Sequence, residues 1–551
     1  MNWEPAARLK THDVTNQSKP FGDLDLFGTD TCLTQAVVPH LAQAELEHLG
    51  DFGRKIGSHS VQELAEDANK NPPVLKSFDR FGHRLDEVAF HPAYHDLMDI
   101  GLSAGIASRG WSGGQGHLMH SALMYLNTAA DVGVCCPMSM TYAGVSVLRR
   151  HPAGSPWTEK IMAGTYDRNF LPLPQKSSAT IGMAMTEKQG GSDVRANTTT
   201  AEQTSDGWRL TGHKWFCSAP MCDAFLTLAQ TANGLTCFLV PRWRKDGGTS
   251  WVRNEMHIMR LKDKMGDRSN ASSEVEYHGA HAQILGEEGT GIRTIIEMVQ
   301  HTRLDCAVIS AGSMRTTLAR ALWHVQHRSA FQRRLIDQPA MRRVLADLAL
   351  EVEAATALSM RLARAFDSSD DAQEAAFARF ATPVAKYWIC KRQPGFVYET
   401  LECFGGVGFV EEHAMARYFR TSPLNAIWEG SGNVIALDIQ RAMSRAPESY
   451  GVVLDWLRDA SGKNTHFDAQ ILRLERMADA ELSEATARRF AEDMGLAMAA
   501  RALCDACPDA VFDGFCNARL DVKGRGLAYG SYSGGVDEAL VIHRASLGPA
   551  G

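Results

Sequence analysis

The sequence lacks any long apolar run. No stretch approaches the ~18 consecutive apolar residues that a membrane-spanning helix requires. The first residues, Met1-Asn2-Trp3-Glu4-Pro5, lack the basic start and the apolar stretch of a secretory signal. We therefore expect a cytoplasmic protein that is neither exported nor anchored in a membrane.

The sequence also lacks a disulfide framework. Its twelve cysteines are spread through 551 residues, singly or in adjacent pairs, whereas disulfide-stabilised folds are short and rich in cysteine. The pair Cys504 and Cys507 has the spacing of a redox or metal site. No second pair and no nearby histidine completes a zinc site there. We therefore predict no bound metal and a structural role for this pair.

A basic excess is missing as well. The formal net charge is −7, so the whole-molecule charge does not favour nucleic-acid binding, although a local basic face stays compatible with it. Nucleotide-binding loops of two common kinds are absent. Because the predicted elements do not alternate between strand and helix as in a parallel sheet, the glycines of 405–408 and 286–291 lack the context that a Rossmann loop needs, and there is no Walker-type loop.

The chain is too long for one compact core, and its texture changes along its length. We predict an α+β protein in four parts. They are a helical domain at 1–182, a β domain at 183–285, a helix bundle at 286–443 and an extra helical domain at 444–551, which becomes glycine-rich at 524–535.

Local patterns support the middle two parts. Asn233-Gly234 joins two short β-branched or aromatic runs, at 224–230 and 235–240, and this dipeptide is a strong hairpin signal because both positions tolerate positive φ. In the bundle, apolar residues recur from Met341 to Ala355 with helical spacing after Pro339, which suits a first helical turn.

One carboxylate lies in an unusual setting, in the segment from Ile427 to Asn433, with Trp428 before it and glycines after it. Glu429 beside apolar side chains is desolvated, which raises its pKa and makes it a better base near neutral pH. The glycines permit close approach of a flat ligand. The alternative is an ordinary surface turn.

Four further clusters have residue types that suit a nucleotide or a ring system. Hydroxyls and glycines occur at 185–193, an aromatic pair precedes a hydroxyl at 214–218, arginine and amide groups occur at 328–338, and a glycine turn follows an acid at 402–406. Taken singly, each has a structural alternative: a turn between domains, a strand core, a solvated helix end or a simple turn.

These clusters and the Glu429 segment occur in the order found in the acyl-CoA dehydrogenases, which the chain resembles over nearly its whole length. The matching segments are Met185-Thr186-Glu187 with Gly191-Ser192-Asp193, Lys214 to Ser218, Arg328 with Phe331 and Gln338, Glu402 to Gly408, and Ile427 to Asn433. Within the family the sequence is most similar to AidB-type members, notably at 185–194, 261–266, 270–272 and 426–433.

The resemblance implies bound FAD, a homotetramer built as a dimer of dimers, and a role for each matching residue. Glu429 corresponds to the base that removes an α-proton from an acyl-CoA. The loop and strand near the flavin ring correspond to Met185, Thr186, Gly191, Ser192, Phe216, Cys217 and Ser218. The groups that hold the dinucleotide end of FAD correspond to Arg328, Phe331 and Gln338. The loop that a partner subunit supplies corresponds to Glu402, Cys403, Gly405 and Gly406. The residues beside the base correspond to Trp428, Ser431 and Asn433.

Two departures matter. Gln332 stands where the family commonly has glycine after the Arg-x-x-Phe pattern, and Trp428 where many members have tyrosine, which narrows the acyl pocket.

Three functions remain open from the sequence. The first is a dehydrogenase for short or branched acyl-CoA. The second is an FAD-containing protein of the alkylation response that binds double-stranded DNA, as AidB-type members imply, through Arg441, Arg519, Lys523 and Arg525. Residues 441–551 hold 13 basic against 16 acidic side chains, which is unfavourable for phosphate contacts unless the basic ones gather on one face. The third is a related flavin oxidase or monooxygenase.

Overall fold

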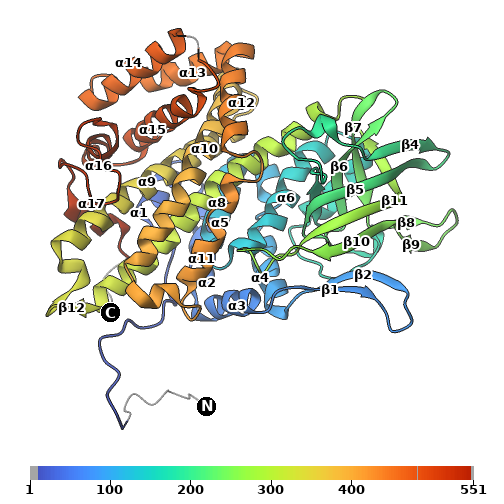
Figure 1. The fold of residues 1–551 in the computed structure, drawn as a ribbon, viewed down its shortest axis with the longest axis horizontal. Helices are drawn as coiled ribbons and strands as arrows, with labels where there is room; N and C mark the ends of the chain where they lie inside the picture. The colour runs from blue at the N-terminus through green and yellow to red at the C-terminus, as the bar shows by residue number, and fades with distance from the viewer. Residues whose placement is uncertain (1–9, 481, 548–551) are drawn as a thin grey trace.

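The computed structural model describes residues 10–480 and 482–547, so the segment Met1 to Pro5 lies outside the described residues. Helices come first, a sheet follows, and helices then continue to the end of the chain (Figure 1). The predicted α+β class is confirmed. Among the described helices, none combines the length and the apolarity needed to cross a bilayer.

The N-terminal part contains seven α-helices within the described residues. Their bounds are α1 (Thr31–Val37), α2 (Gln43–Gly57), α3 (His59–Lys70), α4 (Pro92–Ser103), α5 (Gly116–Asn127), α6 (Val132–Leu148) and α7 (Ser155–Met162). Helix α4 begins with Pro92 in its first turn, where the missing N–H is not needed.

A β-hairpin interrupts these helices, although we expected this region to be helical and irregular. Strand β1 (Val74–Phe78) pairs antiparallel with β2 (Arg84–Ala89). The Asp79 carboxylate accepts hydrogen bonds from the backbone N–H groups of Phe81 (2.8 Å) and His83 (2.9 Å), which closes the turn. The turn carries none of the strong hairpin dipeptides, so the sequence pattern did not reveal it.

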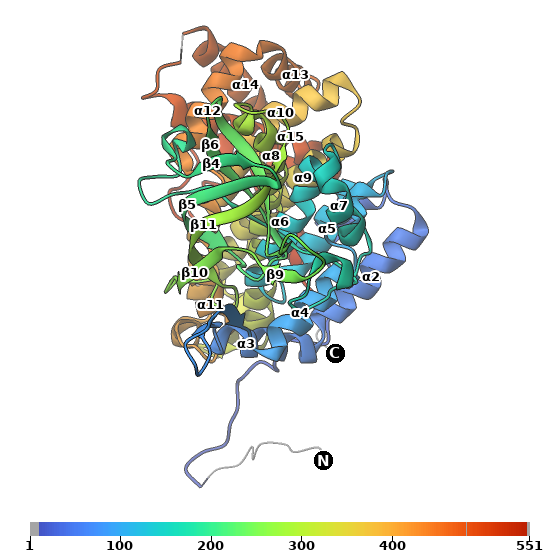
Figure 2. The ribbon, with the colours of Figure 1, turned by 90° about the vertical axis from the view of Figure 1, so that its right-hand side faces the viewer.

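The β part contains a small barrel-like arrangement (Figure 2). Strands β4, β5, β6, β7 and β11 pair in a closed cycle, with β10 beside β11 and β3 parallel to β6. The strand bounds are β3 (Ile181–Ala184), β4 (Thr200–Thr204), β5 (Gly207–Ser218), β6 (Ala224–Thr231), β7 (Gly234–Pro241), β8 (Trp243–Lys245), β9 (Trp251–Arg253), β10 (Met256–Leu261) and β11 (Ser272–Leu285). The predicted hairpin is confirmed, because Thr231 pairs with Gly234 across a turn formed by Ala232 and Asn233.

A long central helix, α8 (Gly291–His327), forms the axis of the molecule and packs against α5, α6, α9 and α10. Almost every residue from Thr302 to Val325 is buried, so this helix shows no single apolar stripe. The other bundle helices are α9 (Pro339–Asp367), α10 (Ala372–Glu402), α11 (Ala414–Thr421) and α12 (Gly432–Arg445). The predicted first turn at Pro339 is confirmed.

The last part consists of α13 (Pro447–Arg458), α14 (Thr465–Asp479), α15 (Ala487–Ala506), α16 (Asp509–Phe515) and α17 (Glu538–Ala545) (Figure 1). Helices α15, α16 and α17 pack on α9, α13 and α15 pack on α10, and α14 packs on α15. Buried acids on α9 hold it there. Glu351 accepts hydrogen bonds from Arg392 (2.8 and 2.9 Å), from Arg519 (2.9 and 3.0 Å) and from Tyr529 (2.6 Å).

The electrostatics of Glu351 follow from these partners. Burial alone would raise the pKa of its carboxyl, but the guanidinium groups of Arg392 and Arg519 outweigh burial and hold the pKa at about 2. A carboxylate whose pKa is depressed in the folded state stabilises the fold at pH above its unfolded pKa of 4.5, and this contribution is lost as the pH falls toward 2.

We predict that Glu351→Gln lowers the free energy of unfolding by about 3 kcal/mol, because it leaves two guanidinium groups without their carboxylate. Urea unfolding at pH 7 measures this loss. The difference from the wild type should be full above pH 4.5 and shrink below it. Exposed Glu448→Gln is the matched control, and an equal loss there would contradict the role of Glu351.

Candidate active site

The turn that carries Glu429 is strained. It joins a 3-10 turn at Leu424–Ala426 to α12, and Glu429 has φ +55°, in the left-handed region that side chains seldom occupy. Gly430 follows at φ +106°. Such a backbone stores roughly 1–3 kcal/mol of strain and persists only where its surroundings enforce it.

Two buried cations enforce this turn by binding three successive carbonyl groups. The Lys386 ammonium, on α10, donates to the carbonyl oxygens of Trp428 (2.9 Å) and Gly430. The Arg303 guanidinium, on α8, donates to the carbonyl oxygen of Glu429 at 3.1 Å. Arg303 also pairs with Asp438 on α12 at 2.9 Å, so the central helix, the turn and the following helix are joined.

The Glu429 carboxylate accepts a hydrogen bond from the Thr302 hydroxyl on α8, at 2.7 Å. Burial raises the pKa of Glu429 above its ordinary value, although Thr302, Arg303 and Lys386 each oppose the rise. The residue as a whole is half-buried, so part of it is open to a substrate. A carboxylate with these properties is suited to general-base catalysis.

The neighbours of Glu429 differ in how firmly they are held. The Trp428 indole donates to Asn425 at 2.8 Å, which sets the orientation of its ring. Ile427 is 61% exposed, so it is not the apolar wall expected from the sequence. Ser431 precedes α12 without a side-chain capping bond, and Asn433 accepts from Arg488 on α15 at 3.2 Å.

The loop of the β part that holds Met185, Thr186, Gly191 and Ser192 is built on a buried ion pair. Glu187 and Lys214 are fully buried, 2.9 Å apart. Glu187 also accepts from the backbone N–H of Thr198 (2.7 Å) and of Thr199 (3.2 Å), which binds the far end of the loop. Met185 and Thr186 are half-buried, and Ser192 is exposed.

The loop needs glycine at position 191. A Cβ there would lie 2.4 Å from the Thr186 hydroxyl, so a side chain at 191 would displace that hydroxyl. This close approach fits a loop that presents hydroxyl and N–H groups to a ligand.

The end of strand β5 exposes two of its three predicted residues. Phe216 is 52% exposed, and Ser218 is half-buried with its hydroxyl 3.3 Å from that of Ser272. Cys217, between them, is fully buried, and burial raises the pKa of its thiol to about 12. Because successive side chains alternate across a strand, the Cys217 thiol belongs to the core, and only its backbone can reach a cofactor.

One buried thiol links strand β5 to Glu429. Burial raises the pKa of Cys136, on α6, to about 12. Ser218 bonds to this thiol and lowers the pKa, while Glu429, also near it, raises the pKa. Ser218 and the Glu429 carboxylate therefore both lie near the Cys136 thiol.

The arginine and amide cluster lies elsewhere. Arg328 donates to the Asn16 carbonyl at 2.8 Å, and Gln338 donates to the Ala330 carbonyl at 3.0 Å. Arg328 is 26 residues beyond Thr302 on α8, which is about 39 Å along the helix. Within one chain, this cluster cannot reach a ligand that also touches Glu429.

Phe331 and Gln332 form a tight turn between two short strands at 329–330 and 333–334, and both have positive φ, +54° and +57°. Glycine is the residue that adopts this conformation without strain, so Gln332 departs from the family pattern at a position where the departure strains the backbone. Phe331 is 89% exposed at the tip.

The glycine turn at the end of α10 lies beside the arginine cluster. Phe404, within it, stacks on His324 with ring centres 4.5 Å apart. Glu402, Gly405 and Gly406 are exposed, with open space where either glycine would carry a Cβ, whereas the Cys403 side chain is buried. Exposed apolar side chains follow at Val407, Phe409 and Val410.

The residues proposed for DNA contact are not all free. Arg441 is exposed but paired with Asp438 at 2.8 Å. Arg519 is committed to Glu351 and Asp347 with a side chain that is 13% exposed, so its assignment to a DNA-binding face is wrong. Lys523 is exposed and Arg525 is half-buried.

Sequence reasoning missed Thr302, Arg303 and Lys386. Lys386 had a signal, because it stands alone in an apolar stretch between Ala385 and Tyr387, where a lysine needs buried acceptors. Thr302 and Arg303 gave no such signal, because the sequence of a helix does not show which distant residue its side chains will contact.

Comparison with known proteins agrees with this architecture. Family profiles match at 16–168 (adaptive response protein AidB, N-terminal domain), 182–280 (acyl-CoA dehydrogenase, middle domain) and 289–444 (acyl-CoA dehydrogenase, C-terminal domain). The putative acyl-CoA dehydrogenase AidB of Escherichia coli K12 is 40% identical over 539 residues, covering 95% of this chain and 96% of that protein.

Solved structures show the same fold. Caenorhabditis elegans ACDH-11 in complex with C11-CoA has a TM-score of 0.81 at 24% identity, covering 98% of this chain and 93% of that chain. A Bacillus anthracis acyl-CoA dehydrogenase complexed with FAD has a TM-score of 0.68 at 14% identity, covering 87% of each chain. Because these profiles cover most of the chain and the Escherichia coli relative is similar along nearly its whole length, the chain belongs to the acyl-CoA dehydrogenase family of FAD-dependent oxidoreductases and is AidB-like.

Proposed function

We propose that the chain dehydrogenates an acyl-CoA, with Glu429 as the base that removes the α-proton of the thioester. The observation that carries the proposal is the Glu429 carboxylate itself: its pKa is raised by burial, Thr302 orients it at 2.7 Å, and two buried cations fix its backbone. Bound FAD supplies the acceptor for the β-hydride.

A second feature of α8 suits the CoA part of the substrate. An open groove of about 700 Å³ at the start of the helix is lined by Ile292, Arg293 and Ile296 and by Arg195 from the β part. Residues 292, 296, 299 and 303 share one helix face, so the groove and Arg303 lie on one side of α8. The helix N-terminus and two arginines favour anionic groups such as the phosphates of CoA.

We further propose that one FAD is held by two chains. Of the expected flavin-ring residues, Ser218 lies near the same buried thiol as Glu429. Arg328, which directly follows α8, lies about 39 Å from Thr302 along the helix axis, and it forms a second group with Gln338 and the turn at 402–406. The second group then serves the partner's ring site, which supports the expected dimer of dimers. Exposed Phe331, Phe409 and Val410 supply apolar surface for such an interface.

A second candidate function, DNA binding, rests on one groove in the C-terminal part. Between α14 and the segment after Leu520, a groove of about 620 Å³ is lined by three cations, Arg473, Arg476 and Lys523, against one acid, Asp521. This local excess offsets the slight acidity of residues 441–551 and offers phosphate contacts. Arg519 is not part of it.

For the dehydrogenase, we predict that Glu429→Gln keeps FAD but slows anaerobic bleaching of the flavin by short-chain acyl-CoAs at least 100-fold, because the general base is lost. Thr302→Val should keep activity but move the acidic limb of its pH profile upward, since it removes a hydrogen bond that lowers the pKa of Glu429. Stopped-flow absorbance measures both. Unchanged bleaching in Glu429→Gln would remove it from the base role.

For the shared cofactor, we predict that Glu429→Gln chains and Arg328→Glu chains are each inactive alone and recover activity when mixed after dissociation. In a mixed pair, one site combines an intact Glu429 with an intact Arg328 from the partner. Recovery is measured as acyl-CoA turnover. The control is the double variant, which carries both changes in the same chain and is dissociated and reassembled in the same way. Absence of recovery in reassembled hybrids would show that each chain binds FAD by itself.

For DNA, we predict that Arg476→Glu with Lys523→Glu weakens duplex binding about 10-fold or more and makes its salt dependence shallower by about two phosphate contacts. Arg441→Glu, an exposed arginine already paired with Asp438, is the control and should change little. Fluorescence anisotropy over a salt series measures both. Binding by the double variant as tight as by the wild type would show that DNA does not bind in this groove.

A further inference from the structure

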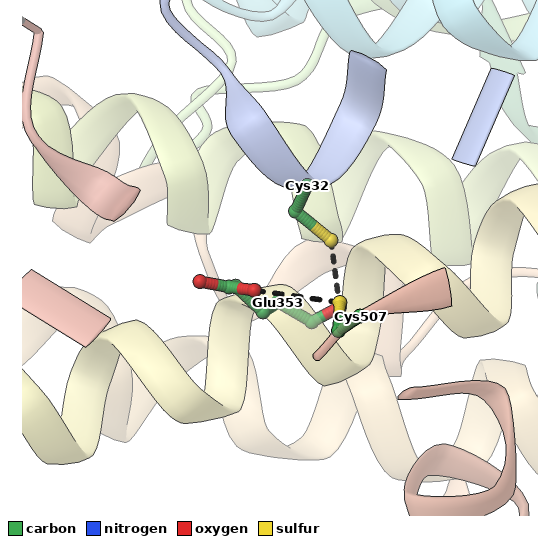
Figure 3. A group of neighbouring side chains, drawn as sticks. All are labelled: Cys32, Glu353 and Cys507. Carbon is green, nitrogen blue, oxygen red and sulfur yellow. Dashed lines mark hydrogen bonds between the residues drawn. The ribbon is translucent and has the colours of Figure 1, made fainter. Parts of the chain in front are cut away.

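A pair of cysteines meets far from Glu429, where the N-terminal and C-terminal parts of the chain touch. Cys32 is on α1, and Cys507 directly follows α15 (Figure 3). Their sulfur atoms and an oxygen of Glu353, on α9, all lie within 4.8 Å of one another, and Figure 3 marks a contact between the two thiols. The partner of Cys507 is therefore Cys32, 475 positions away, and not Cys504.

A metal ion does not fit this cluster well. Both oxygens of Glu353 already accept hydrogen bonds from Arg544, at 2.7 to 3.1 Å, so a metal ion would have to compete with a guanidinium group. Two thiols and one such carboxylate also fall short of the four ligands of a structural zinc site. The chemistry left to the pair is that of two adjacent thiols.

We propose that Cys32 and Cys507 form a reversible redox site, in which a peroxide converts the two thiols to a disulfide. Cys507 is the attacking thiol because it is half-exposed and has a base and a cation beside it. Its S–H donates to Glu353 Oε2 at 3.5 Å, and Arg544 Nη2 donates to its sulfur at 3.6 Å.

Cys32 is suited to the second step. It is buried, at 4% exposure, and its S–H donates to the Glu353 backbone carbonyl at 3.3 Å. The contact with Cys507 and burial both raise the pKa of Cys32, so it stays a thiol until its neighbour is oxidised. It is then the resolving cysteine beside an oxidised one, and buried from competing reagents.

The reaction balances in two steps. The Cys507 sulfur attacks hydrogen peroxide, so that an S–O bond forms, the O–O bond breaks and the S–H proton leaves with the departing hydroxide as water. Cys32 sulfur then attacks Cys507 sulfur, an S–S bond forms, and the hydroxyl leaves as a second water with the Cys32 proton. Each sulfur loses one electron, and the two peroxide oxygens gain them. A dithiol reverses the change.

The disulfide would tie α1 to the end of α15 and so close the C-terminal helices onto the N-terminal part. The sulfurs must approach from at most 4.8 Å to about 2.05 Å, a movement within reach of side-chain rotation at the two cysteines. Glu353 keeps Arg544 as its partner throughout, so the buried charge stays neutralised.

The test is to treat the purified, FAD-loaded protein with hydrogen peroxide and map its cysteines by peptide mass spectrometry. We expect titratable thiols to fall from twelve to ten, with a cross-linked peptide containing Cys32 and Cys507, reversed by dithiothreitol. Cys32→Ser and Cys507→Ser should each abolish the cross-link. Cys504→Ser, a half-exposed cysteine three residues away, is the matched control and should retain it.

Thermal unfolding gives a second readout. The oxidised wild type should melt several degrees above the reduced protein, because a long loop is closed, and neither single-cysteine variant should show this rise. A Cys504–Cys507 disulfide, or Cys507 oxidised to sulfinic acid while Cys32 stays free, would overturn the proposal. So would twelve unmodified thiols at a peroxide excess that oxidises an unstructured cysteine peptide.

Discussion

Two buried cations hold the backbone around Glu429, and the proposed chemistry depends on them. Lys386 binds the carbonyl oxygens of Trp428 and Gly430, and Arg303 binds that of Glu429. A left-handed glutamate would otherwise relax, and its carboxylate would leave Thr302. Because these cations come from α10 and α8, the position of one carboxylate is set by the packing of the whole helix bundle.

Buried charged groups also fix the position of a neighbouring segment at the C-terminal helices. Helix α9 presents Asp347, Glu351 and Glu353 to arginines from later in the chain, at Arg519 and Arg544. These ion pairs are buried, so the loss of one partner would leave an uncompensated charge, and the C-terminal helices dock where every pair can form. The docking also brings Cys507 close to Cys32, which places the two thiols of the proposed redox site at the contact between the C-terminal and N-terminal parts.

Much of the fold follows from local sequence patterns. Asn233-Gly234 predicts its hairpin, whose turn uses the positive φ of Gly234, and Pro339 predicts the start of α9 because its fixed φ suits a first helical turn. The hairpin at Val74–Ala89 was missed because its turn is closed by the Asp79 side chain instead. Family resemblance, not periodicity, placed Glu429.

The site itself was only partly predictable. Charge alone could not tell that Arg519 is an internal ion-pair residue while Lys523 is exposed, since both are basic residues near the same glycine-rich segment. Nor could sequence order show that Cys217 points into the core, or that Arg328 lies far from Glu429. These are distances and directions, which only tertiary packing determines.

The separation of the two residue groups along α8 has a thermodynamic consequence under the proposed arrangement. A cofactor that touches two chains binds the assembled form better than the separate chains, so cofactor and assembly are linked. By reciprocity, assembly must strengthen cofactor binding by the same factor that the cofactor strengthens assembly. Flavin content would then depend on protein concentration, and a diluted sample would lose its colour and its quaternary structure together.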